Sequence, residues 1–216
     1  MKYLIALLII TLNLTAYSQN DISRISATAK TITLPFGSYS ERMRKWTNNS
    51  PSELDSNNRK YLVGALKSNS QLIINEKGGT SFGDLDYRDS WSFLDDVKRT
   101  ALVGIIKVPN SRGFILYLKS KLDEPEPFAE WHGILIACDE NGKVINWIYS
   151  DGDANGGNPH GNISREFTIS PWGIIKVKEG AWGDNIDTYG FTGTFKIVNN
   201  KIVLQSQHFI EGKSAK

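Results

Sequence analysis

Residues 131–162, with the sequence WHGILIACDENGKVINWIYSDGDANGGNPHGN, contain the strongest fold signal in the chain. Two apolar runs flank Asn141-Gly142, a dipeptide that favours a tight hairpin turn because both residues tolerate a positive φ angle. A segment rich in Asp, Asn and Gly follows, and we expect it to form a long loop over residues 151–162. The stretch therefore predicts a β-hairpin followed by a polar loop.

The same pattern continues on both sides of this hairpin. Apolar or alternating runs of strand length cover residues 101–108, 114–122, 133–139, 143–150, 163–169, 174–178, 189–198 and 201–209. Turn-forming segments near residues 110, 141, 172 and 199 alternate with longer connections. We therefore expect a mainly all-β protein, an antiparallel up-and-down meander of about eight strands closed as a barrel or as a two-layer sheet.

The N-terminus has the pattern of a secretory signal peptide over residues 1–18. A basic start at Lys2 is followed by an apolar run that is too short to span a bilayer, and small residues stand at Ala16 and Ser18. We expect cleavage after Ser18. The mature protein would then be periplasmic or secreted, with no stable membrane anchor.

The remaining chain is expected to divide into three parts. Residues 19–98 are irregular in pattern, with a short helix beginning near Asp55 or Ser56, and they would pack on the β-domain. The β-meander domain covers residues 99–211, and residues 212–216 form a disordered tail. The formal net charge is +2, without a strong basic cluster, which gives no support to a nucleic-acid partner.

Three longer connections, over residues 123–130, 151–162 and 179–188, are expected at one end of the sheet because consecutive antiparallel strands alternate in direction. They contain no Lys or Arg and carry the acidic residues Asp123, Glu124, Glu126, Glu130, Asp151, Asp153, Glu179, Asp184 and Asp187. Binding residues often lie on loops carried by a rigid scaffold. We therefore predict an acidic, aromatic rim whose ligand-binding residues are Trp131, His160, Trp182, Glu130 and Asp184.

Part of this rim matches the opening of a calcium-binding loop. Asp151, Asp153 and Asn155 have the D-x-D-x-N-G spacing in which alternating side-chain oxygens converge on one cation. The twelfth position is Asn162 rather than a bidentate Glu, and Pro159 occupies the ninth. Calcium is therefore a possible cofactor, with these three residues as its ligands. An ordinary Asp- and Asn-rich connection is the alternative.

Histidine and cysteine are the other residue types that could support chemistry. The three histidines have no zinc-binding spacing, and His208 is expected to be semi-buried on the strand face of Ile202 and Leu204. Cys138, the only cysteine, shares strand alternation with Ile134 and Ile136 and is expected to be a buried, inert thiol.

These observations favour an exported, non-enzymatic binding or interaction module with an unknown ligand, a glycan or a protein. One alternative is a glycan-type hydrolase that uses rim carboxylates as acid and base. Another is a calcium-stabilised structural domain. No motif marks a catalytic residue, so enzymatic activity stays open.

Three short motifs resemble a group of uncharacterised exported β-rich proteins of Gram-negative bacteria, many of them lipoproteins. They are LPF at residues 34–36, VGIIK at residues 103–107 and NGKVI at residues 141–145. The resemblance implies a similar β-fold over roughly residues 31–208 and no particular activity. The chain departs from this group because it lacks a lipidation cysteine.

Overall fold

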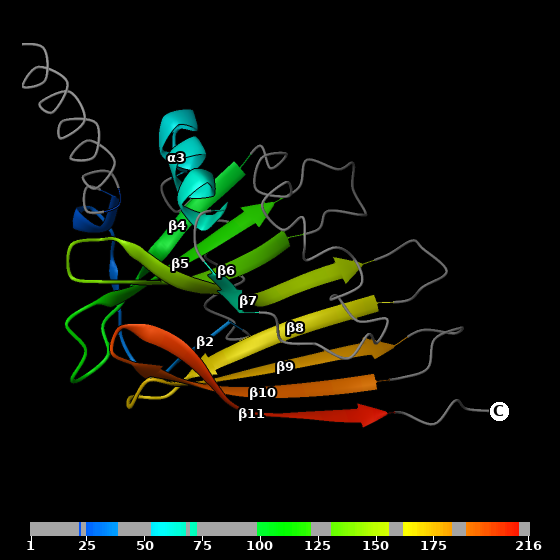
Figure 1. The fold of residues 1–216 in the computed structure, drawn as a ribbon. Helices are drawn as coiled ribbons and strands as arrows, with labels where there is room; N and C mark the ends of the chain where they lie inside the picture. Colours follow the sequence, from blue (N-terminus) through cyan, green and yellow to red (C-terminus); the bar gives the residue numbers. More distant parts are fainter. Residues whose placement is uncertain are drawn as a thin grey trace, which may run out of the picture.

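The computed structural model describes residues 22, 25–38, 53–67, 70–72, 99–121, 131–155, 162–182 and 189–211 (Figure 1). The predicted signal peptide and the predicted tail lie outside these residues. In the part of the chain that the structure describes, no helix combines the length and the apolar character needed to cross a membrane.

Eight long strands follow one another through the sheet in chain order, each antiparallel to the next (Figure 1). Their bounds are β4 Arg99–Ile106, β5 Phe114–Lys121, β6 Trp131–Cys138, β7 Val144–Asn155, β8 Asn162–Ile169, β9 Ile174–Trp182, β10 Tyr189–Val198 and β11 Lys201–Glu211. The prediction of a mainly β protein is confirmed.

Within the described part of the N-terminal region, three short strands join the same sheet. Strand β1 (Thr31–Ile32) is parallel to β4, β2 (Phe36–Gly37) is antiparallel to β8, and β3 (Ser70–Leu72) is parallel to β7. The result is one mixed sheet with more strands than predicted, and it is not closed. The predicted closure into a barrel is therefore wrong. Short strands from elsewhere in the chain cover part of the sheet edge, which barrel closure would otherwise have to protect.

The sheet forks between β7 and β8. The first half of β7 pairs with β3 at residues 146–148, and its second half pairs with β8 at residues 152–155. Strand β8 changes partner in the same way, from β7 to β2 at Thr168 and Ile169. The fork coincides with a register shift in the β6–β7 ladder, which leaves Ser150 as an extra residue. Strand β7 continues to Asn155, so the predicted loop start at residue 151 is wrong.

Two apolar clusters hold the sheet together. One cluster joins strands from the two sides of the fork, with Tyr117, Leu135 and Ile148 packed with Phe167 and Phe195. Because these residues come from both sides of the fork, the sheet curls so that its two halves share one core.

The second cluster lies beneath helix α3 (Ser56–Lys67), which covers β4–β7 (Figure 1). The Asp55 carboxylate caps this helix by accepting a hydrogen bond from the Asn58 amide at 2.8 Å. The buried Trp147 indole donates to the Leu66 carbonyl at 3.3 Å and ties the helix to β7.

Tight turns gather at one end of the sheet, on the left in Figure 1. The Asn141-Gly142 connection is a turn as predicted, but only Gly142 has a positive φ, 82°. The turn with two positive φ angles, as a type I′ turn requires, is Asn199-Asn200 at 48° and 62°. The Asn200 amide oxygen also accepts hydrogen bonds from Ser111 Oγ at 2.6 Å and the Gly113 amide at 2.8 Å. These bonds link the β10–β11 turn to the β4–β5 connection.

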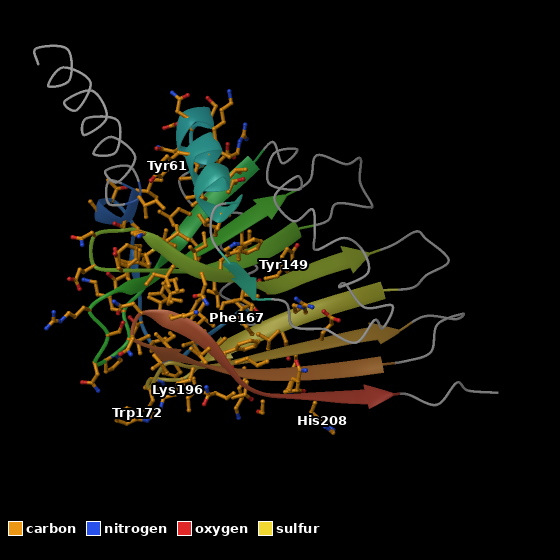
Figure 2. The ribbon with its side chains drawn as sticks, viewed as in Figure 1. Tyr61, Tyr149, Phe167, Trp172, Lys196 and His208 are labelled. Atoms are coloured by element: carbon orange, nitrogen blue, oxygen red, sulfur yellow. The ribbon has the colours of Figure 1, made fainter. Side chains whose placement is uncertain are left out.

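Two expectations about single residues have opposite outcomes. Cys138 is buried among the apolar residues of the second cluster, as predicted. His208 is exposed, so its predicted partial burial is wrong (Figure 2). The inward-facing position of Ile202 does not repeat further along β11, where residues 204–208 are all exposed, and a register shift interrupts the β10–β11 ladder at Thr194/Phe195.

Candidate functional site

A buried polar cluster occupies the fork of the sheet. Asp151 is completely buried, and its Oδ2 atom accepts a hydrogen bond from the Tyr117 hydroxyl at 2.8 Å. Its Oδ1 atom accepts one from the Ser150 hydroxyl at 2.8 Å. The Lys119 ammonium lies 3.9 Å from Oδ2. Side chains from β5 and β7 therefore meet around one carboxylate.

Gly133 of β6 makes this meeting possible. It stands directly between Lys119 and Asp151 in the register of the three strands. A Cβ atom at position 133 would overlap the Asp151 carboxylate, so only glycine leaves room for that carboxylate to lie over β6.

Burial shifts both ionisable partners toward their neutral forms. Desolvation raises the pKa of Asp151, although the Lys119 charge and the two hydroxyl donors act in the opposite direction. Desolvation likewise lowers the pKa of Lys119, although the Asp151 charge opposes the change. The pKa of Tyr117 lies well above its ordinary value, mainly because the side chain is buried. The cluster thus brings an amine and a carboxyl together in a setting that penalises their charges.

A second charged pair lies on the other side of the fork. Arg165 of β8 and Glu179 of β9 are direct cross-strand partners, and the guanidinium Nε donates to Glu179 Oε2 at 2.6 Å. Arg165 Nη2 contacts the same oxygen. Arg165 Nη1 donates to the Tyr149 carbonyl at 3.3 Å, and the guanidinium lies 5.8 Å from the centre of the Tyr149 ring. Tyr149 of β7 and Phe167 of β8 are labelled in Figure 2.

The two pairs belong to one polar region. The positive charge of Arg165 is among the influences that lower the pKa of Asp151. We call Tyr117, Lys119, Ser150, Asp151, Arg165 and Glu179 the fork cluster. Its members come from β5, β7, β8 and β9.

The structure moves two predicted rim residues into the interior. Asp151 and Glu179 were expected in exposed loops, but each lies within a strand and is buried. Their strands continue further than the turn-like composition suggested, to Asn155 and Trp182. An enclosed carboxylate such as Asp151 does not reach a substrate outside the protein.

The backbone brings several other predicted site residues to one end of the sheet. Trp131 pairs with Asp153, and Asn162 pairs with both Asn155 and Trp182. The side chains of these residues lie outside the described set, as do the predicted ligand-binding residues Glu130, His160 and Asp184. We call this part of the sheet the open end. It comprises the ends of β5, β7 and β9 and the beginnings of β6, β8 and β10.

The described residues contain no group of three or more His, Cys, Asp or Glu side chains that could hold a metal ion. Asp151 directs its oxygens to Tyr117, Ser150 and Lys119. The calcium site stays a prediction, because the side chains of Asp153 and Asn155 lie outside the described set.

Sequence reasoning missed Tyr117, Lys119 and Arg165. The signal that could have revealed them is strand alternation: Lys119 has the same parity as Ile115 and Tyr117, and Arg165 has the parity of Phe167. A charged residue at the inward position of a strand indicates either a buried pair or a functional site.

Comparison with known proteins gives no match to the chain among protein-family models, curated proteins or solved structures.

Proposed function

We propose that the protein is an exported, non-enzymatic binding module whose ligand, a glycan or a protein, contacts the open end of the sheet. The observation that carries this proposal is the fork cluster. It contains four buried or mostly buried charged side chains, which lie on the strands that lead to the open end. The tight-turn end, by contrast, has an apolar interior and hydrogen-bonded turns.

Buried ion pairs contribute little net stability, because the cost of desolvation offsets their attraction. Their better-attested role is to specify one arrangement of the elements that carry them. In this protein the pairs hold β5, β7, β8 and β9 at fixed positions. Loops carried by strands held in this way would present a preformed binding surface, which lowers the entropic cost of binding.

Aromatic residues at the open end suit either class of ligand. Trp131 and Trp182 lie at strand ends there. Flat indole rings can stack on sugar rings and also act as anchors in protein interfaces. Glu130, Asp184 and His160 are the polar contacts that we propose beside them. Periplasmic or secreted location forms part of the proposal and is tested by cell fractionation.

The test uses paired tryptophan variants. Purified protein is titrated with a panel of soluble oligosaccharides, and a photo-crosslinking amino acid at position 182 probes protein ligands in the intact cell. Trp131→Ala and Trp182→Ala are expected to weaken binding of the retained ligand by at least about tenfold. Trp172→Ala is the matched control, because Trp172 is 74% exposed in the β8–β9 turn at the opposite end (Figure 2).

The proposal is wrong if Trp172→Ala weakens binding as much as the two open-end variants do. It is also wrong if crosslinks form equally from positions 172 and 182. Either result would place the contact surface away from the open end.

A further inference from the structure

Lys119 and Asp151 face each other across an intervening strand. Lys119 of β5 and Asp151 of β7 each pair with Gly133 of β6 in the strand register. Because Gly133 has no side chain, the Lys119 amine approaches to 3.9 Å from Asp151 Oδ2. Strands on either side of a third strand lie about 9–10 Å apart, so the absence of a side chain at Gly133 is what lets the two groups meet above β6.

The surroundings desolvate both members of the pair and so shift each of them toward its neutral form. The Lys119 side chain is 12% exposed and that of Asp151 is 0% exposed. The Tyr117 ring, which lies next to the pair, packs against Phe36 and Phe167 at 5.8 and 5.1 Å between ring centres. The pKa directions agree with this environment, since the Asp151 pKa is raised and the Lys119 pKa is lowered. Transfer of one proton from the ammonium to the carboxylate gives a neutral amine beside a carboxylic acid.

We propose that Lys119 and Asp151 condense to form an isopeptide bond between β5 and β7. The lone pair of Lys119 Nζ attacks Asp151 Cγ, a Cγ–N bond forms, and the bond from Cγ to Oδ2 breaks. Oδ2 leaves as water, carrying the acid proton and one proton that originates on the amine. No oxidant, cofactor or second substrate is consumed.

Two hydroxyl groups are positioned to assist this step. Ser150 donates to Oδ1, the oxygen that carries negative charge in the tetrahedral intermediate. Tyr117 donates to Oδ2, the departing oxygen. The Tyr117 hydroxyl protonates Oδ2 as it leaves and recovers a proton from the attacking amine, so Tyr117 returns to its starting state.

The fold also supplies the driving force that the same reaction lacks in water. In water, solvation of the ammonium and carboxylate ions stabilises the reactants. In the protein interior these two charges are poorly solvated, so their replacement by a neutral amide is favoured. The reacting groups are held together by three paired strands, which makes the step intramolecular. This inference is independent of the proposed binding function.

Intact-mass spectrometry of the purified full-length protein tests the proposal. The folded protein is expected to be one water lighter than the mass calculated for its own N-terminus and sequence. Proteolysis should yield a branched peptide that joins residues 119 and 151. Lys119→Met and Asp151→Ala should restore the full mass. Lys178→Met, on an exposed lysine of β9, should retain the water loss.

A further variant separates this reaction from any other dehydration. Asp151→Asn keeps a carbonyl at the same position, so the bond would form with loss of ammonia instead of water. Tyr117→Phe is expected to slow bond formation by at least about tenfold while far-UV circular dichroism stays unchanged. Equal rates for Tyr117→Phe and the unaltered protein would remove Tyr117 from the mechanism.

The decisive measurement needs no variant, so misfolding of a variant does not obscure the result. If the unaltered, folded protein has its full calculated mass after prolonged incubation near neutral pH, the proposal is overturned. Recovery of linear peptides containing unmodified Lys119 and Asp151 would overturn it equally.

Discussion

Replacement of Glu179 by Gln is expected to destabilise the protein by about 3–5 kcal/mol, because the buried Arg165 guanidinium loses the carboxylate charge that it contacts directly. The two side chains are 3% and 1% exposed, so water cannot replace the missing charge. Arg165 keeps its hydrogen bond to the Tyr149 carbonyl, but a carbonyl oxygen carries no full charge. The reciprocal variant Arg165→Met should cost a similar amount, since it leaves Glu179 buried beside an apolar side chain.

The double variant Arg165→Met/Glu179→Leu distinguishes this explanation from simple loss of packing. Replacing a whole buried ion pair by apolar residues is often neutral or stabilising, so we expect the double variant to lie within about 1 kcal/mol of the unaltered protein. The coupling energy between the two positions should therefore be large. Urea denaturation followed by tryptophan fluorescence gives the free energy of unfolding, and the coupling energy is taken from the unaltered protein, Arg165→Met, Glu179→Leu and the double variant.

A neighbouring cross-strand pair provides the matched control. Glu166 and Lys178 face each other on the same two strands, and Lys178 is exposed. Glu166→Gln should change the free energy of unfolding by less than about 1 kcal/mol. Two results would refute the reasoning: equal losses for Glu179→Gln and Glu166→Gln, or a double variant as unstable as the sum of its single variants.

Three further predictions concern Asn146, Gly133 and Cys138. Asn146→Ala should lower the free energy of unfolding in urea by about 2 kcal/mol or more, because Asn146 exchanges hydrogen bonds of 2.8 and 3.1 Å with the backbone of the buried Ile202. A free energy of unfolding within about 0.5 kcal/mol of that of the unaltered protein would contradict this prediction. Gly133→Ala should lower the free energy of unfolding by about 1–3 kcal/mol in the same assay, because the added methyl group displaces the Asp151 carboxylate. Gly64→Ala in α3 is the control: an added Cβ there meets nothing within 4 Å, so this variant should stabilise the protein by about 0.5–1 kcal/mol. Burial raises the pKa of the Cys138 thiol from 9.0 to about 12, so its contribution to stability is complete below pH 9.0 and is lost as the pH rises toward 12. Relative to Cys138→Ala, the free energy of unfolding should fall by about 1.4 kcal/mol per pH unit in that range, and parallel pH profiles would argue against a buried neutral thiol.

The long strands could be predicted because their signal is local. In β10, Phe195 and Ile197 alternate with polar residues, and such a period of two marks a half-buried strand without knowledge of its partner. Strands β1, β2 and β3 were not predicted as parts of the sheet. They contain only two or three residues, and each pairs with a strand far away in the sequence. Periodicity cannot identify the distant strands with which such short segments pair.

The errors at the site have one physical cause. Asp, Gly and Asn favour turns, so residues 151–155 were assigned to a loop. Whether such residues lie in a strand depends on their neighbours. Gly133 leaves room for the Asp151 carboxylate, and Tyr117 and Ser150 satisfy its oxygens. None of these partners except Ser150 is close to Asp151 in the sequence.

Register shifts are equally hard to predict. The extra residue at Ser150 changes which side chains of β7 face Gly133, and a similar shift interrupts the β10–β11 ladder at Thr194/Phe195. A single inserted residue reverses the alternation for the rest of a strand.

The fork cluster connects the four strands on which the proposed binding end depends. A fork weakens a sheet, because β7 and β8 share a ladder only between residues 152–155 and 162–165. The cluster provides contacts where that ladder ends: Lys119 links β5 to β7, Arg165 links β8 to the Tyr149 carbonyl of β7, and Glu179 adds β9. An amide between Lys119 and Asp151 would make the first of these links permanent.

Breaking the cluster should therefore loosen the open end of the sheet before the tight-turn end unfolds. In Glu179→Gln, the backbone amides of residues 152–155 should lose hydrogen-exchange protection earlier than those of residues 134–137. Equal loss of protection in both segments would mean that the fork and the apolar core unfold as one unit.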